Sequence, residues 1–182
     1  AEIINDYKKK NYKVIVISSA MSGVTNTLIK KSLEISNNFS KSEYDVLVSS
    51  GEQIACSLIA ARLNHNGYKS RSWLSWQVPI ITVGAHMNSR INQINKKKII
   101  KYLKEGGIPV IAGFQGVNNE NRITTIGRGG SDASAIMFAK FFKAKRCIIY
   151  TDVEGVFTTD PNKLKKAKKI KIISYEEMLE MA

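Results

Sequence analysis

The sequence predicts an α/β fold, a three-layer α/β/α sandwich with a mainly parallel central sheet. Two nearly continuous apolar runs, "KVIVISS" at 13–19 and "IPVIAGF" at 108–114, predict strands buried on both faces. Helical patterns separate these runs, and strands that alternate with helices are typical of parallel sheets. Because no internal repeat or long linker divides the 182 residues, we expect one domain over 1–182.

The first expected elements each have a local signal at one end. Residues 1–10 predict the end of a first helix, ahead of the first strand. Thr25 or Asn26 is expected to cap the next helix, because short polar side chains accept hydrogen bonds from free helical amides. A long helix over 44–66 is expected to stop at Gly67, since glycine favours the left-handed turn that ends many helices.

The later elements follow the same alternation of short apolar runs and longer helical patterns. They are a strand at 70–74, a lysine-coated helix at 93–105 that ends at Gly106-Gly107, the strand at 108–114 followed by a turn rich in Gly and Asn, a helix at 131–142, and strands at 146–150 and 170–174. The final "SYEE" fits a capping box, with Ser174 as the cap and Glu177 three residues further on.

The net charge of +13 comes mostly from lysine, in runs at 8–10, 96–98 and 163–171. A basic surface attracts nucleic acids or anionic substrates. Lysine is much commoner than arginine here, and no aromatic residues interleave with the runs, whereas base reading favours arginine and strand binding favours aromatic platforms. We therefore expect solvated faces. A basic nucleic-acid-binding module is the alternative.

The two cysteines, Cys56 and Cys147, lie among apolar neighbours and predict reduced core thiols rather than a disulfide framework. Neither lies near a second thiol or a histidine in the sequence, so we expect no zinc or other metal-ligand cluster. The longest apolar runs fall well short of the ~20 residues of a membrane span, and no signal peptide is visible. These features predict a cytoplasmic protein.

Three polar loops follow three of the expected strands, at 19–25, 113–132 and 151–160. They are rich in glycine and hydroxyl side chains, more so than simple connections require. Ligands of open α/β sheets bind beyond the carboxyl ends of the strands. We therefore expect the three loops to lie on one rim and to form a site.

The stretch "GRGGSDASA" at 127–135 combines a flexible backbone with charge. The amides of 129–131 can form a nest for an anion, supported by the positive end of the following helix. Arg128 offers a planar fork for a carboxylate or phosphate. Asp132 would repel that anion unless a metal ion, a lysine or a substrate ammonium lies nearby. Helix capping alone explains one of these residues but not Arg128 together with three glycines.

Two other stretches carry polar groups next to glycine. "SAMSGVT" places the hydroxyls of Ser19, Ser22 and Thr25 around a glycine turn, although hydroxyl residues often only cap helices. "GE" at Gly51 and Glu52 falls inside the long helical pattern and leaves two interpretations open. Either Glu52 is solvated, or Gly51 lets another segment approach while Glu52 points into a site.

"TDVEGV" places Thr151 and Asp152 at the end of an expected strand, where a base or ribose can be held. His65 and His86 are isolated from other candidate groups. Surface or core positions are therefore expected for both histidines rather than a part in catalysis.

Taken together, these motifs resemble those of the aspartate kinase branch of the amino acid kinase family. The matching segments occur in the family's order: "VISSAMSGVTN", "SSGEQ", "GFQGV", "TTIGRGGSDASA", "YTDVEGVFTTDPN" and "SYEEMLEMA". The resemblance implies phosphoryl transfer from ATP, bound with Mg²⁺, to the side-chain carboxylate of L-aspartate. The product, 4-phospho-L-aspartate, opens the routes to lysine, threonine, methionine and diaminopimelate.

The resemblance also assigns site residues. Those implied around aspartate are Ser19, Thr25, Glu52, Phe114, Arg128 and Asp132, with Arg128 and Asp132 catalytic. Those implied around ATP are Gly129, Gly130, Ser131, Thr151, Asp152, Phe157 and Asp160. Arg128 fits a substrate carboxylate and Glu52 a substrate ammonium. The family often has tyrosine where Phe157 stands and arginine where Asn162 stands.

The resemblance implies a partial catalytic domain, truncated at both ends. Family members begin with a strand and a "KFGGTS"-like loop, whose lysine stabilises the transferred phosphoryl group and is oriented by the counterpart of Asp132. A later "GAKVLHP"-like segment and regulatory ACT domains are also expected of the family and are not in this sequence. Two interpretations stay open, a fragment of a longer kinase and an inactive remnant, and a non-catalytic subunit that assembles with an intact one is a third. A homo-oligomer is the other assembly that stays open.

Overall fold

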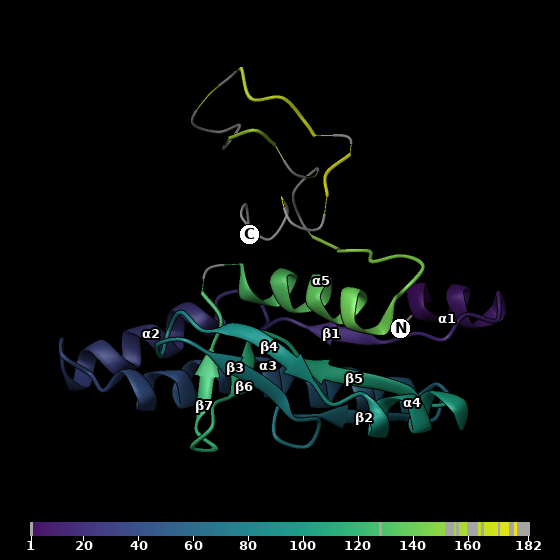
Figure 1. The fold of residues 1–182 in the computed structure, drawn as a ribbon, viewed down its shortest axis with the longest axis horizontal. Helices are drawn as coiled ribbons and strands as arrows, with labels where there is room; N and C mark the ends of the chain where they lie inside the picture. Colours follow the sequence, from purple (N-terminus) through teal and green to yellow (C-terminus); the bar gives the residue numbers. More distant parts are fainter. Residues whose placement is uncertain are drawn as a thin grey trace.

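The computed structural model describes residues 2–127, 129–151, 155, 157–159, 164, 166–170, 172–174 and 177. Its helices and strands form an α/β/α arrangement, which confirms the predicted fold class (Figure 1). A parallel sheet contains β1 (Val16–Ser18), β5 (Ile108–Ala112) and β2 (Ser70–Trp73), in the order β1-β5-β2. The apolar runs at 13–19 and 108–114 therefore form neighbouring strands, as their composition predicts.

A second sheet extends the fold with four strands that the sequence pattern did not reveal. In sheet order they are β4 (Arg90–Ile94), β3 (Ile80–Val83), β6 (Gln115–Val117) and β7 (Ile123–Thr125). The β3–β6 pair is parallel, and the two outer pairs are antiparallel. Buried polar side chains help to join this sheet, since the hydroxyls of Thr82 and Thr124 lie 2.5 Å apart.

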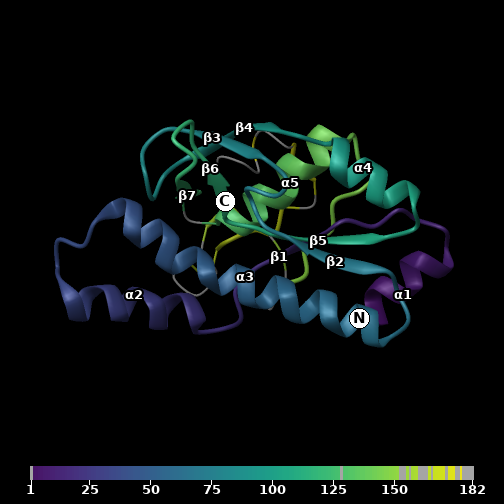
Figure 2. The same ribbon diagram turned by 90° about the horizontal axis from the view of Figure 1, so that it is seen from below.

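Helices cover both faces of the parallel sheet (Figure 2). On one face, α4 (Lys97–Lys104) and α5 (Gly130–Phe142) contribute to a hydrophobic cluster that includes Ile111 of β5. On the other face, α3 (Lys41–His65) packs against Ile108, Val110 and Ala112 of β5. The alternating side chains of one buried strand thus serve two hydrophobic clusters, as expected for a central strand.

The helix boundaries differ from expectation in two places. α2 (Val24–Ile35) begins before Thr25, and its N-cap is Gly23 with a φ of 78°, so the predicted Thr25 or Asn26 cap was wrong. The expected helix at 93–105 begins only at Lys97, because β4 takes the residues before it. α1 (Glu2–Lys9) and α5 lie close to where they were expected.

α3 is long and apolar enough to cross a membrane by length and composition alone. Among the described residues it lies along the parallel sheet and buries one of its faces there. A core helix of this kind satisfies the same criteria as a membrane span, so the composition of α3 is explained by its packing in the sandwich.

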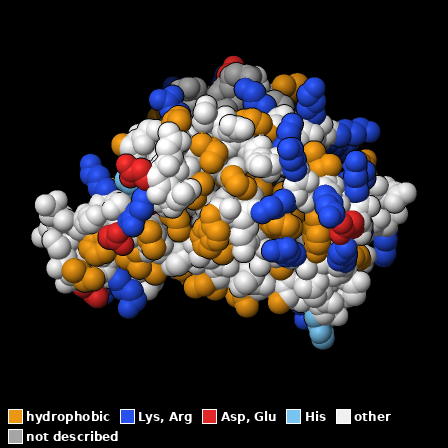
Figure 3. All heavy atoms as spheres, turned by 60° about the horizontal axis from the view of Figure 1, so that its bottom comes forward, with side chains coloured by type: hydrophobic (Ala, Val, Ile, Leu, Met, Phe, Trp, Pro, Cys, Tyr) orange, Lys and Arg blue, Asp and Glu red, His pale blue; other side chains and the backbone are white. Residues whose placement is uncertain are grey.

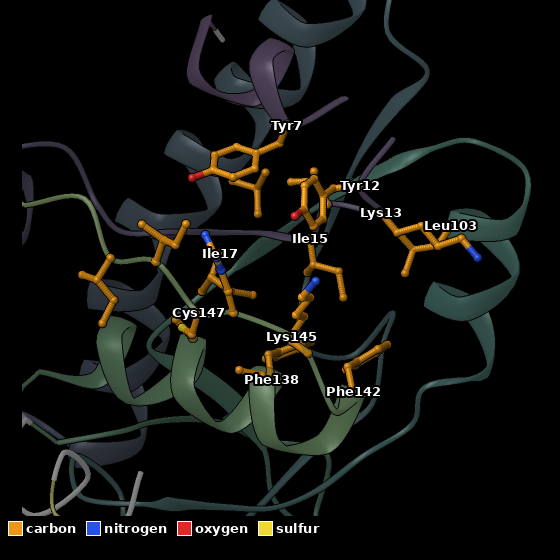
Figure 4. Close-up of a pocket in the computed structure, with 18 of the residues that line it drawn as sticks. Tyr7, Tyr12, Lys13, Ile15, Ile17, Leu103, Phe138, Phe142, Lys145 and Cys147 are labelled. Atoms are coloured by element: carbon orange, nitrogen blue, oxygen red, sulfur yellow. The ribbon is translucent and has the colours of Figure 1, made fainter. Parts of the chain in front are cut away.

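The strand expected at 146–150 is absent, and so is the strand at 170–174 among its described residues. A groove of about 830 Å³ separates 146–150 from β1, which pairs only with β5 in the described part of the chain (Figure 4). Ile15 and Ile17 line one side of this groove, and Phe138 of α5 lines another. The run at 146–150 has strand-forming residues, but among the described residues no strand pairs with it.

The structure also bears on the expected capping box and on the two cysteines. Ser174 and Glu177 form the predicted capping box, because each backbone N–H donates to the side chain of the other residue, at 2.9 and 3.1 Å. Both cysteines are free thiols. Cys56 is fully buried in the core, whereas Cys147 is only half-buried, in the groove beside β1.

Lysine and arginine side chains gather on one side of the face drawn in Figure 3, and hydrophobic side chains are scattered between them. The helix α4 contributes lysines at 97, 98, 101 and 104, with the apolar Ile99 on its buried side. The lysine-coated helix is thus amphipathic, as the sequence pattern predicts.

Candidate active site

A cavity of about 640 Å³ opens where β1 and β5 end. The chain leaves β1 through Ser19 and leaves β5 through Gly113 and Phe114, on the same edge of the parallel sheet. The described residues that line the cavity include most of those singled out from the sequence, namely Ser19, Thr25, Glu52, Phe114, Gly127, Gly129, Gly130, Ser131 and Asp132. Two of the three predicted loops therefore meet at one rim.

Two glycines allow these loops to converge. A Cβ on Gly113 would lie 2.9 Å from the carbonyl oxygen of Ser18 and 3.3 Å from the Cα of Ser131. A Cβ on Gly130 would lie only 2.4 Å from Cδ2 of Phe114. Any larger residue at either position would separate the end of β5 from β1 or from the start of α5.

Phe114 is held in an unusual backbone conformation, with a φ of 63°. Its N–H donates to the Ser134 hydroxyl at 3.0 Å, and its carbonyl accepts from the N–H of Ile126 at 2.9 Å. These bonds place the aromatic ring against Gly130 at the first turn of α5. Left-handed conformations of non-glycine residues persist where the surroundings hold them, often at functional sites.

The first turn of α5 is open toward the cavity. Its N-cap is Gly129, with a φ of 70°, and no side chain caps the helix. Simple capping by Ser131 or Asp132 therefore does not explain the motif. Free amides and the positive end of the helix dipole are available to an anion here. Arg128 lies outside the described residues, but Gly127 and Gly129 on either side of it line the cavity.

Glu52 is buried on α3 with an exposed fraction of 3%. Its Oε1 accepts the N–H of Ala20 at 3.1 Å, whereas Oε2 has no hydrogen-bond partner in the described part of the chain. Burial raises the pKa of this carboxyl to about 7, and backbone hydrogen bonds only partly oppose the shift. A buried carboxylate with a free oxygen is suited to a cationic ligand group.

Gly51 explains how Glu52 reaches the cavity. A Cβ at this position would lie 3.0 Å from Cβ of Ala20 and 3.2 Å from Cγ1 of Val24. The segment after β1 therefore crosses α3 closely at this glycine. Of the two interpretations left open by the sequence, the solvated carboxylate is wrong, and the close approach with Glu52 pointing inward holds.

Asp132 stands at the junction of the cavity and the groove beside β1, because it lines both, together with Ser19 and Ser131. The aspartate is half-buried, and burial raises its pKa. No described side chain forms a hydrogen bond or ion pair with it. A cation at this place would lower the pKa again, in keeping with the expectation that Asp132 has a positive neighbour.

The residues expected around a nucleotide are only partly brought together. Ser131 lines the cavity, but Thr151 is exposed and Phe157 pairs with Lys169 in an isolated bridge. Neither Thr151 nor Phe157 lines the cavity or the groove. Asp152, Asp160 and Asn162 lie outside the described residues.

Sequence reasoning missed several residues that line the cavity, among them Tyr44, Val48, Met87 and Thr125. Tyr44 and Val48 precede Glu52 at intervals of four, so they share its face of α3, and this spacing is a signal that the sequence contained. Met87 has no such signal, because the turn between β3 and β4 carries it to the cavity. His86, for which a surface or core position was expected, is absent from the described lining and contacts the buried Asp45.

No group of three or more His, Cys, Asp or Glu is arranged to hold a metal ion among the described residues. The described lining of the 640 Å³ cavity also has no Lys or Arg. Its charged groups are the carboxyls of Glu52 and Asp132, opposite the helix end at Gly130. This set offers one pole for cations and another for anions, which is an arrangement suited to a ligand that carries both charges.

The sequence profile of the amino acid kinase family matches residues 1–182, and the chain belongs to this family. Among curated proteins, the aspartokinase of Rickettsia felis is 50% identical over an alignment of 185 residues that covers 100% of this chain and 46% of that protein. The aspartokinase of Geobacillus stearothermophilus is 49% identical over 180 residues, 99% of this chain and 44% of that protein. The chain thus spans about half the length of the curated relatives it matches.

Solved structures show the same fold. The aspartate kinase from Synechocystis superposes with a TM-score of 0.74 at 35% identity, over 99% of this chain and 30% of that one. Aspartokinase III of E. coli, in complex with aspartate and ADP, superposes with a TM-score of 0.73 at 25% identity, over 86% of this chain and 46% of that one.

Proposed function

We propose that the chain is the catalytic part of an aspartate kinase, which transfers the γ-phosphoryl group of ATP to the side-chain carboxylate of L-aspartate. The observation that carries this proposal is the free Oε2 of buried Glu52, in one cavity with the open first turn of α5. The relatives named above support the choice of substrate, because aspartokinases align with the whole length of this chain.

The proposed acceptor site uses the two poles of the cavity. The ammonium group of aspartate binds Glu52, whose carboxylate lacks a partner, and the binding of this cation keeps Glu52 ionised. A carboxylate of aspartate binds the fork of Arg128, for which two parallel hydrogen bonds are available. The hydroxyls of Ser19, just after β1, and of Thr25, in the first turn of α2, supply further hydrogen bonds, and Phe114 forms another part of the wall.

The proposed donor site is the glycine loop itself. The backbone N–H groups of 129–131, at the positive end of α5, donate hydrogen bonds to phosphate oxygens of the nucleotide. An oxygen of the aspartate side chain then attacks the γ-phosphorus, the bond from this phosphorus to the bridging oxygen breaks, and ADP leaves. Such transfers depend on positioning and on neutralising charge, because the protein forms no covalent bond with the group.

Mg²⁺ is expected to enter with ATP. The residues present fit this role to the extent that Asp132, a half-buried carboxylate without a described partner, stands beside the glycine loop. Mg²⁺ in such sites needs only one or two protein carboxylates, since phosphates and waters fill its other positions. Asp132 would hold this ion, or a lysine, at the junction of the cavity and the groove, and the cation would neutralise phosphate charge there.

The test is a trapping assay with hydroxylamine, which converts an acyl phosphate into a hydroxamate. It uses the chain alone and a chimera in which the chain replaces the matching part of the Geobacillus stearothermophilus aspartokinase. We expect the chimera to form the hydroxamate from L-aspartate and ATP. Hydroxamate from glutamate or acetylglutamate in its place would overturn the choice of substrate.

The same assay addresses the alternative of an inactive remnant. A chimera that forms no hydroxamate with any acceptor, although it is folded and the parent enzyme is active, would favour that reading over the proposed function. A salt titration with mixed oligonucleotides distinguishes a basic nucleic-acid-binding module from the proposed kinase. Strong binding of the oligonucleotides at physiological salt would favour the nucleic-acid-binding module.

A further inference from the structure

Asp45 is a fully buried carboxylate on α3, directly after Tyr44 of the cavity lining. Its Oδ1 accepts the hydroxyl of Thr125 at 2.5 Å and the N–H of Met87 at 3.0 Å. Its Oδ2 lies 2.5 Å from Nδ1 of His86 and 3.2 Å from the same Met87 N–H. A buried charge is tolerated only when it is paired in this way.

These contacts join three separate parts of the cavity wall. Asp45 comes from α3, Met87 from the turn between β3 and β4, and Thr125 from the end of β7. Met87 and Thr125 both line the cavity, whereas Asp45 does not. The carboxylate therefore lies behind the wall and holds it from outside.

Met87 needs such a restraint. Its φ is 68°, in the left-handed region that non-glycine residues avoid. Conformations of this kind persist only where neighbouring groups hold them in place. The N–H of Met87 donates to both oxygens of Asp45, so one carboxylate fixes the backbone at the residue with the unfavourable conformation.

The turn that carries Met87 also supports the glycine loop. A Cβ on Gly127 would lie 2.8 Å from Oδ1 of Asn88, so the Asn88 side chain lies against the residue that begins the loop. The N–H of Ser89 donates to the carbonyl of Thr125 at 3.0 Å, and Ser89 bridges to Ile126. Displacement of the turn would thus reach Ile126 and Gly127, the end of the loop next to Arg128, for which we propose a carboxylate of aspartate as the ligand.

We propose that Asp45 is a positioning residue, which fixes the Met87 turn and Thr125 as a rigid wall of the acceptor site without touching substrate. The inference rests on the proposed function for its effect on substrate, but its structural part does not depend on any ligand. Asp45→Asn keeps the size of the side chain and removes the charge that binds His86 and the two donors. Glu43→Gln, on the same helix, removes an equal charge from an exposed ion pair with Arg122 and is the matched control.

The structural measurement is amide hydrogen exchange of the chain itself, followed by NMR. We expect the Met87 amide to exchange at least about tenfold faster in Asp45→Asn than in the wild type, with Val110 of β5 unchanged. Glu43→Gln should leave both amides unchanged. Should Asp45→Asn fail to fold, His86→Gln removes one partner of the carboxylate and should accelerate exchange at Met87 by a smaller factor. Unchanged exchange at Met87 in a folded variant would overturn the proposal.

The kinetic measurement separates positioning from general loss of structure. In the chimera described above, Asp45→Asn should raise the KM for L-aspartate about tenfold, while kcat and the KM for ATP stay within about twofold. An unchanged KM for aspartate would overturn the proposed role, as would an equal loss with both substrates. A wild-type chimera without aspartate activity would instead refute the proposed function and leave the exchange result to decide whether Asp45 anchors the turn.

Discussion

Ala20 donates its backbone N–H to the buried carboxylate of Glu52 at 3.1 Å, across a crossing made close by Gly51. The bond occupies Oε1 and leaves Oε2 without a described partner. The first residue after Ser19 is thereby tied to α3. This contact holds a buried carboxylate in the lining of the cavity.

The first prediction concerns the pH dependence of stability. Burial raises the pKa of Glu52 to about 7, compared with roughly 4.3 for a glutamate in an unfolded chain. The folded protein therefore binds the Glu52 proton more tightly than the unfolded chain does. The stability that this protonation contributes is fully present below the unfolded pKa and is lost as the pH rises through about 7. We expect the unfolding free energy of the wild type to fall, relative to Glu52→Gln, by on the order of 3 kcal/mol up to pH ~8.

Urea unfolding of both proteins at several pH values between ~5 and ~8 measures this difference. Glu43→Gln, which removes an exposed carboxylate from the same helix, should follow the wild type. Curves for the wild type and Glu52→Gln that run parallel across the range would show that Glu52 is ionised in the folded protein throughout.

A second prediction tests the contact between Gly130 and Phe114. Gly130→Ala should destabilise the protein by about 1–3 kcal/mol, because the new Cβ would overlap the aromatic ring in a packed interior. The penalty should shrink in a Phe114→Ala background, where the ring is gone. The unfolding free energies of the wild type, the two single variants and the double variant measure the coupling between Gly130 and Phe114. Equal penalties in both backgrounds would mean that the two residues do not contact each other in solution.

The fold could be predicted where local composition alone determined it. The strands β1 and β5 lie in nearly continuous apolar runs, and α3 and α5 in long helical patterns. The short strands β6 and β7 have no such pattern, since they form by pairing with each other around a turn. The strand predicted at 146–150 was wrong for the opposite reason: its residues favour a strand, but among the described residues no strand pairs with them.

The candidate site also contains residues that the sequence pointed to and residues that it did not. Its glycines and charges were found because their combination is rare in sequences that serve only structure. Met87, Thr125 and Asp45 were missed because they are ordinary residues whose role arises when the β3–β4 turn packs on α3. Tertiary contacts between distant segments leave little trace in one sequence.

The third prediction concerns Arg128, which remains a sequence-based assignment. In the chimera, Arg128→Ala should lower kcat/KM for aspartate by about tenfold to a hundredfold, because charge-assisted hydrogen bonds contribute roughly 1.5–3 kcal/mol each. Arg128→Lys should recover little, since lysine lacks the planar fork. Steady-state kinetics with each substrate varied will measure this. Normal aspartate kinetics with a raised KM for ATP would place Arg128 at the nucleotide end of the site.

The fourth prediction concerns Asp132, which lines both the cavity and the groove. Asp132→Asn preserves the shape of the side chain but removes its charge, so a neighbouring cation would no longer be held near the transferred group. In the chimera we expect kcat to fall by at least about tenfold, with a smaller change in either KM. A change confined to the KM for aspartate would instead assign Asp132 to acceptor binding.

We propose that the cavity between β1, α3 and α5 binds the acceptor amino acid with its ammonium group at Glu52. A crystal structure of the chimera with L-aspartate and a non-hydrolysable ATP analogue would show this binding mode. We predict density for aspartate between Glu52 and the glycine loop, with its nitrogen within hydrogen-bonding distance of Oε2. Aspartate bound elsewhere, or in this cavity with its ammonium group directed away from Glu52, would contradict the claim.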